Sequence, residues 1–239
     1  MARRSQKRNA LGIRKKDVEL IARTALPHIF LQLARARILK EEHLREPTQL
    51  VRILMNHRRE AIRKIEWCAA LDHTFLEEAC KYWRKRDKTV AIVLYATAIE
   101  QCINSYFQLI LEAKGWSRPS ATELIRSSKN ASKLRWLFES FVGNNFPVRL
   151  RERIEKIFTI RNAIVHFKAI PGRLDEHTDS HSRITREIAT LRRMSLSRDF
   201  SLLENAMFEG MLKVDPDREL AWKAAEQLAK ARPIKRRRG

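Results

Sequence analysis

Glycine, proline and cysteine are scarce in this sequence, which has 239 residues but only 6 glycines, 7 prolines and 3 cysteines. Few glycines and prolines leave little turn chemistry for a sheet of many strands. Long stretches rich in Ala, Leu, Glu, Lys and Arg favour helices instead. We therefore predict an all-α protein, and its 44% of hydrophobic residues suffice for a proper core.

The three cysteines, Cys68, Cys80 and Cys102, lack the close spacing of metal ligands, and an odd number argues against a disulfide framework. We interpret them as reduced thiols in the core of a cytoplasmic protein. No apolar run approaches the ~20 residues that cross a membrane. The basic N-terminus has no adjacent apolar segment of the kind found in secretory signals. The sequence thus predicts a cytoplasmic protein without a membrane partner.

Acidic residues are few relative to basic ones: 28 Asp and Glu stand against 49 Lys and Arg, which makes the net charge +21. Residues 1–16 and 230–239 contain basic residues and no acidic one. Such tails attract polyanions, because Lys and Arg release counterions from phosphates. They are equally compatible with a role in solubility or weak nonspecific binding. The candidate nucleic-acid contacts in the tails are Arg3, Arg4, Lys235, Arg236, Arg237 and Arg238.

Charge and hydrophobic periodicity divide the chain into four parts. We expect a flexible basic arm at 1–16, an N-terminal helical region at 17–82, a main helical bundle at 83–212, and a C-terminal helix with a basic tail at 213–239. Within the main bundle, residues 89–113 form a long pattern that is apolar on most sides over its first half. This predicts a central helix.

The most informative stretch is TIRNAIVHFK, residues 159–168. We interpret it as part of a buried helix that carries Arg161, Asn162 and His166 between apolar neighbours. Asn162 and His166 are four residues apart and therefore share one helix face. Upstream, Glu100 places a charge in the apolar helix at 89–113, where it needs either a partner or a cleft. The alternatives are a solvated stripe for Glu100, a surface ion pair for Arg161 and a satisfied core histidine for His166.

Other Arg–His pairs have the same spacing: Arg23 and His28 on one stretch, and Arg52 and His57 on another. Arg161 differs from these in three respects. An asparagine follows it, its flanks are apolar, and a helix that bears a glutamate lies upstream. The combination, rather than the spacing, indicates a functional site.

This combination resembles the HEPN superfamily, the helical-bundle domains of many bacterial toxins and RNA-defence ribonucleases. Their signature is an Arg, a polar residue next to it, and a His after four to six intervening residues. The resemblance covers roughly residues 83–212 and implies a helical bundle of HEPN type, with additional N-terminal helices and basic tails. It also implies a homodimer with the motif helices at its interface. A toxin or phage-defence effector with an antitoxin or regulatory partner fits this picture.

The resemblance implies metal-independent cleavage of RNA, with no cofactor and no metal ligands. The 2′-OH would attack the adjacent phosphate and leave 2′,3′-cyclic phosphate and 5′-OH ends. His166 would act as general base or acid, and Arg161 would stabilise charge on the phosphate. Asn162 would orient His166 or the phosphate, and Glu100 would orient Arg161 through an ion pair. Lys168 stands where some members carry a tyrosine that a partner nucleotidyltransferase adenylylates, and is a candidate phosphate contact.

Two further hypotheses stay open. The chain could be a non-enzymatic, basic helical nucleic-acid-binding protein, or an inactive HEPN-like scaffold or partner domain. His177 and His181 have the i, i+4 spacing of helical metal ligands, but they lie in a polar stretch that we interpret as a loop. The five tryptophans are interpreted as core residues rather than as platforms for base stacking.

Overall fold

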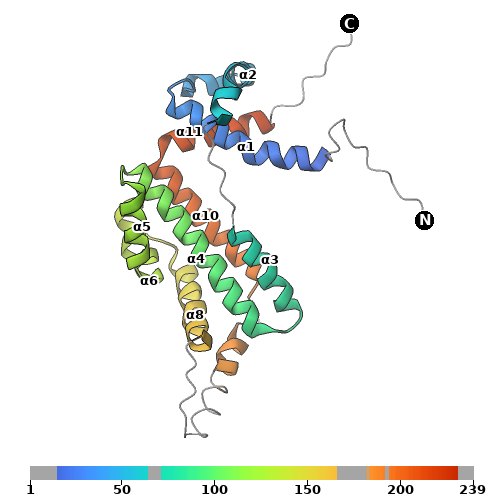
Figure 1. Cartoon of the computed structure of the whole chain (residues 1–239), viewed down its shortest axis with the longest axis vertical. Helices are drawn as coiled ribbons and strands as arrows, with labels where there is room; N and C mark the ends of the chain where they lie inside the picture. The colour runs from blue at the N-terminus through green and yellow to red at the C-terminus, as the bar shows by residue number, and fades with distance from the viewer. Residues whose placement is uncertain (1–14, 64–70, 166–181, 183, 192–193, 231–239) are drawn as a thin grey trace, which may run out of the picture. The chain divides into compact units, whose positions relative to one another are not determined.

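The computed structural model describes residues 15–63, 71–165, 182, 184–191 and 194–230. Every regular element in these ranges is a helix and no strand occurs among them, which confirms the all-α fold class. The chain divides into two compact units, one of Met1–Cys68 with Asp215–Gly239 and the other of Ala69–Val214. The helices of both are drawn in Figure 1, and each unit has its own hydrophobic core.

Unit 1 is a small helical cluster built from both ends of the chain. Its elements are α1 (Lys15–Arg35), the 3₁₀ helix η1 (Glu41–Arg45), α2 (Pro47–Arg63) and α11 (Pro216–Lys230). α1 packs against α2 and α11. It stays helical through Pro27, where the sequence predicts an interruption or kink. Its buried residues include Phe30, Leu33, Leu50, Ala61, Ala221 and Ala224.

Asp215 explains why the C-terminal helix begins where it does and joins α1. Its carboxylate accepts hydrogen bonds from the backbone N–H of Arg218 at 3.0 Å and from Arg218 Nε at 3.2 Å. Pro216 follows at a position where proline favours a helix start. The same carboxylate lies 3.5 Å from Arg35 Nη2, at the end of α1. The predicted helix restart at Asp215 and Pro216 is therefore confirmed.

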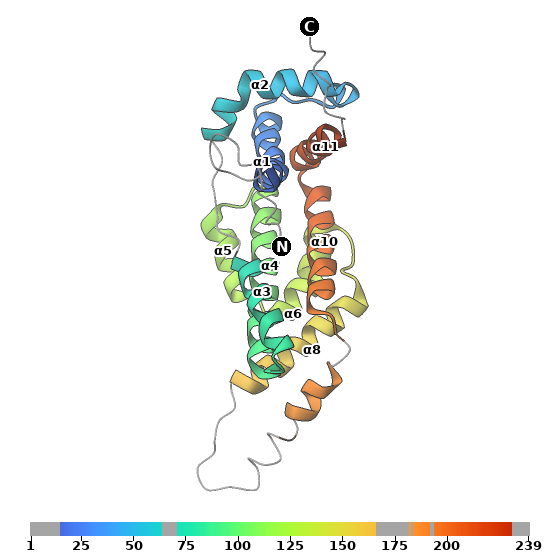
Figure 2. The ribbon, with the colours of Figure 1, turned by 90° about the vertical axis from the view of Figure 1, so that its right-hand side faces the viewer.

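Unit 2 is organised around one long helix, α4. Its elements are α3 (Leu71–Arg84), α4 (Lys88–Ala113), α5 (Arg118–Ser127), α6 (Asn130–Ser132), the π-helical turn η2 (Lys133–Leu137), α7 (Phe138–Val142), α8 (Val148–Val165) and α10 (Leu196–Val214). α3, α5, α8 and α10 all pack on α4 (Figures 1 and 2). The Asp87 carboxylate caps α4 by accepting from the Val90 N–H at 3.2 Å. The helix predicted at 89–113 is confirmed.

The two units group the helices differently from the four ranges expected from the sequence. α3 was placed in the N-terminal region, but it packs along α4 with Ala79 fully buried. The partly buried side chains of Phe75, Leu76 and Trp83 complete the core around α4. The polar run Ser-Arg-Asp at 197–199 predicts a possible break between helices, but α10 begins at Leu196 and runs through it. Asp199 is buried there and pairs with Arg153 of α8 at 2.7 Å.

α4 is long and apolar enough, by length and composition, to cross a membrane. This differs from the expectation that no apolar run approaches that length. In unit 2, however, its apolar side chains lie in the core: Ile99 and Phe107 are each 1% exposed. Packing against α3, α8 and α10 therefore accounts for the apolar character of this helix.

Three tryptophans contradict the expectation that this residue type fills the core. Trp116, Trp136 and Trp222 are 40%, 55% and 41% exposed. Trp116 lies edge-on to Phe141, with ring centroids 6.0 Å apart, so one of its faces is still packed. Trp83 is partly buried against the core of unit 2, as expected.

Gly210 lies where α10 meets α7. A Cβ built at this residue would come within 2.8 Å of Cζ of Phe138 and 3.4 Å of Cγ1 of Val142. The Phe138 ring has little room to move, because it is 3% exposed and meets Phe146 edge-on at a centroid distance of 5.3 Å. Glycine at this residue therefore permits the close approach of the two helices.

We expect Gly210→Ala to destabilise unit 2 by about 1–3 kcal/mol through overpacking. At an open helical position, replacing glycine with alanine would raise the free energy of unfolding by about 1 kcal/mol. A decrease in Gly210→Ala would therefore indicate the tight contact with Phe138. Urea denaturation of the variant and the wild type measures it. Phe138→Leu should relieve the cost in the Gly210→Ala background. A more stable Gly210→Ala protein would contradict the close packing.

Candidate active site

Arg161 occupies the edge of the contact between α8 and α4. The buried side chains of Ile154, Ile157 and Ile160 hold α8 against the core, where they are at most 3% exposed. Arg161 is the next residue, about 100° further round the helix. It is therefore carried from the core to its border, where α4 presents Glu100.

Three of the predicted site residues meet at this border. Nη2 of Arg161 lies 3.4 Å from Oε2 of Glu100, and their side chains are 28% and 34% exposed. Nη1 of Arg161 donates a hydrogen bond to Oδ1 of Asn162 at 2.9 Å. A guanidinium has five N–H donors in a planar fork, so the remaining N–H groups can bind an anion. The partner that Glu100 requires in its apolar helix is Arg161.

The network extends to residues for which the sequence analysis predicted no role in the site. Nδ2 of Asn130 donates to Oε1 of Glu100 at 3.2 Å. Nζ of Lys133 donates to Oδ1 of Asn130 at 3.1 Å and to Oδ1 of Asn104 at 2.7 Å. The Glu100 carboxylate is thus held from two sides, by Arg161 and by Asn130. Because Asn130 also binds the Glu100 carboxylate, that carboxylate restricts the orientation of the Arg161 side chain more than a mobile carboxylate would.

Lys133 is a buried cation, only 3% exposed. Burial lowers the pKa of its ammonium below the usual value for lysine, and the Glu100 carboxylate opposes part of that shift. The side chain points inward from the π-helical turn η2, whose Leu134 and Leu137 are also buried. Single π-helical turns occur frequently at functional sites. Here the turn places Lys133 within hydrogen-bonding distance of Asn104 and Asn130.

An open cleft of about 550 Å³ adjoins this network. Its lining residues are Glu100, Ser128, Lys129, Asn130, Ala131, Glu155, Phe158, Thr159, Arg161 and Asn162. At its border, Arg135 binds Glu155 through two hydrogen bonds of 2.9 Å, from Nε and from Nη2. The hydrogen bond from Arg135 lowers the pKa of the Glu155 carboxyl, although partial burial opposes it. Acidic and basic side chains balance along the cleft.

The other predicted site residues lie outside the described residues. His166 follows Val165, the last residue of α8 as described. Lys168, the pair His177 and His181, and the basic tails at 1–14 and 231–239 are also outside. The structure therefore brings together Glu100, Arg161 and Asn162, and adds Asn104, Asn130 and Lys133 to them.

Comparisons of this chain with protein-family models, with curated proteins and with solved structures give no match.

Proposed function

We propose that this protein is a metal-independent endoribonuclease of the HEPN type. One feature supports this above others: the ion pair of Arg161 with Glu100, joined to Asn162, at the edge of an open cleft. In the sequence His166 follows Asn162 by four residues, which is the spacing of residues that share a helix face. The pattern read from the sequence is thereby supported by contacts between two helices.

In this proposal the RNA supplies its own nucleophile, the 2′-OH next to the scissile phosphate. His166 takes the proton of that hydroxyl or gives one to the leaving 5′-oxygen. The free N–H groups of Arg161 bind the phosphate oxygens and stabilise the charge that develops there. Glu100 holds Arg161 in place, and Asn130 holds Glu100. Asn162 orients His166 or the phosphate with its amide nitrogen, since its contact with Arg161 occupies only the amide oxygen.

A homodimer is part of the proposal, because one cleft alone is poorly suited to an anion. Glu100 offsets Arg161, and Arg135 is occupied by Glu155. Two motif helices that face each other across a two-fold axis would add a second Arg161, with Lys168 and the basic tails as further phosphate contacts. The exposed Val165, at the described end of α8, is apolar surface that such an interface would cover. As a toxin or defence effector, the dimer would need an antitoxin or regulatory partner.

The test is incubation of the purified protein with end-labelled RNA in EDTA. We expect cleavage, with 2′,3′-cyclic phosphate and 5′-OH ends identified by mass spectrometry. The matched substrate has the same sequence with 2′-deoxyribose throughout, and it should stay intact because it lacks the nucleophile. Cleavage of both substrates, or products with 5′-phosphate ends, would contradict this chemistry.

The net charge of +21 and the basic tails favour one alternative, a nucleic-acid-binding protein without activity. It predicts RNA binding that falls steeply with salt and with removal of residues 1–14 and 231–239, without cleavage. An inactive HEPN-like scaffold predicts a dimer with neither cleavage nor tail-dependent binding. Filter binding at several salt concentrations and analytical ultracentrifugation separate these outcomes from the proposed enzyme.

A further inference from the structure

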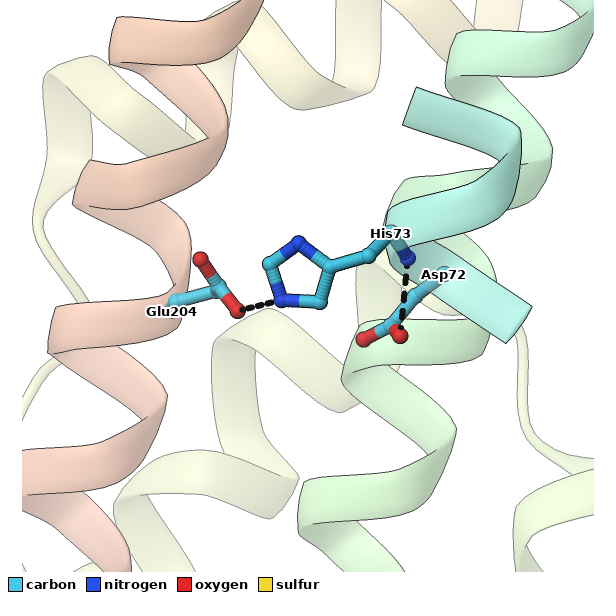
Figure 3. A group of neighbouring side chains, drawn as sticks. All are labelled: Asp72, His73 and Glu204. Atoms are coloured by element: carbon cyan, nitrogen blue, oxygen red, sulfur yellow. Dashed lines mark hydrogen bonds and ion pairs between the residues drawn. The ribbon is translucent and has the colours of Figure 1, made fainter. Parts of the chain in front are cut away.

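A second cluster of polar side chains lies in unit 2 between the first turn of α3 and the middle of α10. It consists of Asp72, His73 and Glu204 (Figure 3), and it shares no residue with the cleft. One donor atom from each side chain lies within 4.8 Å of the other two. Among the described residues, this is the one such group of three His, Cys, Asp or Glu side chains.

Figure 3 shows the His73 ring pointing toward Glu204, with the Asp72 carboxylate beside the backbone nitrogen of His73. Nε2 of His73 lies 2.8 Å from Oε1 of Glu204. The imidazole meets Phe200 edge-on, with ring centroids 5.7 Å apart, so a core residue of α10 fixes the ring plane. Oδ1 of Asp72 accepts a hydrogen bond from the backbone N–H of His73 at 2.9 Å. His73 therefore contacts both carboxylates, through its ring to Glu204 and through its backbone N–H to Asp72.

The cluster brings two carboxylates and one imidazole together, with donor atoms within 4.8 Å of one another. Carboxylates this close repel each other, and the repulsion grows where side chains are partly buried, as those of Asp72 and Glu204 are. A divalent cation matches both carboxylates and accepts the imidazole lone pair.

We propose that Asp72, His73 and Glu204 bind a divalent transition-metal ion of the Zn²⁺ class. One nitrogen and two carboxylate ligands suit Zn²⁺, Mn²⁺ or Co²⁺, whereas Mg²⁺ and Ca²⁺ prefer oxygen alone. Bonds of about 2.0–2.2 Å in a tetrahedron separate ligand atoms by about 3.3 Å. The 2.8 Å contact between His73 and Glu204 would widen by about half an ångström. The longer separations in the group, which reach up to 4.8 Å, would close by about an ångström or more. Water takes the fourth position on the exposed side of His73.

Such an ion would join α3 to α10, two helices that both pack on α4. It would therefore stabilise unit 2 in the folded state, since ligands brought together by folding bind the ion more tightly than the unfolded chain does. This role is independent of RNA cleavage and stands if the proposed nuclease activity fails.

The experiment is isothermal titration of the metal-free, full-length protein with ZnCl₂, supported by Co²⁺ absorption spectroscopy and thermal unfolding. We expect one saturable site, a Co²⁺ spectrum of low coordination number, and a higher Tm with Zn²⁺. Asp72→Asn and Glu204→Gln should each weaken the binding at least about tenfold and remove the Tm increase. Asp72→Asn is the more informative variant, because it removes one negative charge with little other change. An asparagine oxygen can still accept a hydrogen bond from the His73 backbone N–H, and the contact between His73 and Glu204 remains.

The matched control is His43→Ala. His43 also lies beside a glutamate, with Nε2 3.7 Å from Oε1 of Glu42, but without a third ligand. Its loss should leave the titration unchanged. Binding weaker than about 0.1 mM in the wild type, or equal binding by wild type and Asp72→Asn, overturns the proposal. So does an equal loss in His43→Ala, which would mean that a histidine beside a single glutamate binds the ion without this site.

Discussion

Replacing Arg161 or His166 with alanine is expected to slow RNA cleavage by about 10²–10⁴-fold while the protein stays folded. General acid–base catalysis and stabilisation of a developing anion each contribute on that scale. Arg161 is 28% exposed on its side chain and lies at the border of the core, so its removal costs little packing. Single-turnover cleavage rates measure the effect, and circular dichroism melts show whether the fold is retained.

The chain offers a matched control with the same spacing. Arg52 and His57 are five residues apart in sequence on α2, as Arg161 and His166 are in the motif. Arg52 is exposed, and α2 belongs to the other unit. Arg52→Ala and His57→Ala should leave the rate within about twofold, as for surface changes of about 0.5 kcal/mol or less. Equal losses at both pairs would show that general basicity, not this motif, drives cleavage.

The variant Glu100→Gln tests whether Glu100 acts by positioning Arg161 rather than by contacting the phosphate itself. The glutamine keeps the shape of the side chain and a hydrogen bond, but it removes the charge that holds Arg161. We expect a smaller loss of cleavage than in Arg161→Ala, with little change in RNA binding. In the Arg161→Ala background, Glu100→Gln should cost almost nothing more, since both changes act on one contact. Additive losses would mean that Glu100 acts without Arg161.

The helices could be predicted from the sequence because their signals are local. The apolar character of residues 89–113, with a Lys-Gly stop after them, predicted α4 to within one residue. The stretch Asp215-Pro216-Asp217 predicted a last helix from about Arg218, two residues after the observed start of α11 at Pro216. The grouping of helices into units is a different kind of property. It depends on which apolar faces meet, and those of α3 and α11 meet α4 and α1.

The candidate site shows the same limit. Glu100 was predicted because a lone charge in an apolar helix needs a partner, and Arg161 because of its motif. Lys133 gave no such signal, since lysine in an Arg- and Lys-rich chain indicates a solvated surface. Its burial depends on the π-helical turn at Lys133–Leu137, which shifts the helical register by an amount that no residue pattern announces. The sequence offers Asn130 or Ser132 as the cap of a helix, but the residue at the cap is Lys129, and Asn130 is the first residue of α6.

Replacing Phe30 with alanine is expected to unfold unit 1 at a lower denaturant concentration and to leave unit 2 unchanged. Phe30 is fully buried on α1, and truncating such a ring costs about 3–5 kcal/mol. This is a large part of the 5–15 kcal/mol that typically stabilises a whole domain. The two cores share no side chain, so the truncation removes packing from the core of unit 1. Hydrogen exchange measured by mass spectrometry across a urea series resolves peptides from each unit.

Phe107→Ala is the mirror variant, because Phe107 fills the core of unit 2 on the same helix as Glu100. Its cost of about 3–5 kcal/mol should appear in peptides from 71–165 and should abolish cleavage, since the helix that holds Arg161 in place loses its packing. Phe30→Ala should retain cleavage of a short RNA that needs only the cleft. If each variant shifts the peptides of both units together, the chain unfolds as one cooperative body. Cleavage lost in Phe30→Ala while unit 2 stays protected would instead place part of the RNA-binding surface on unit 1.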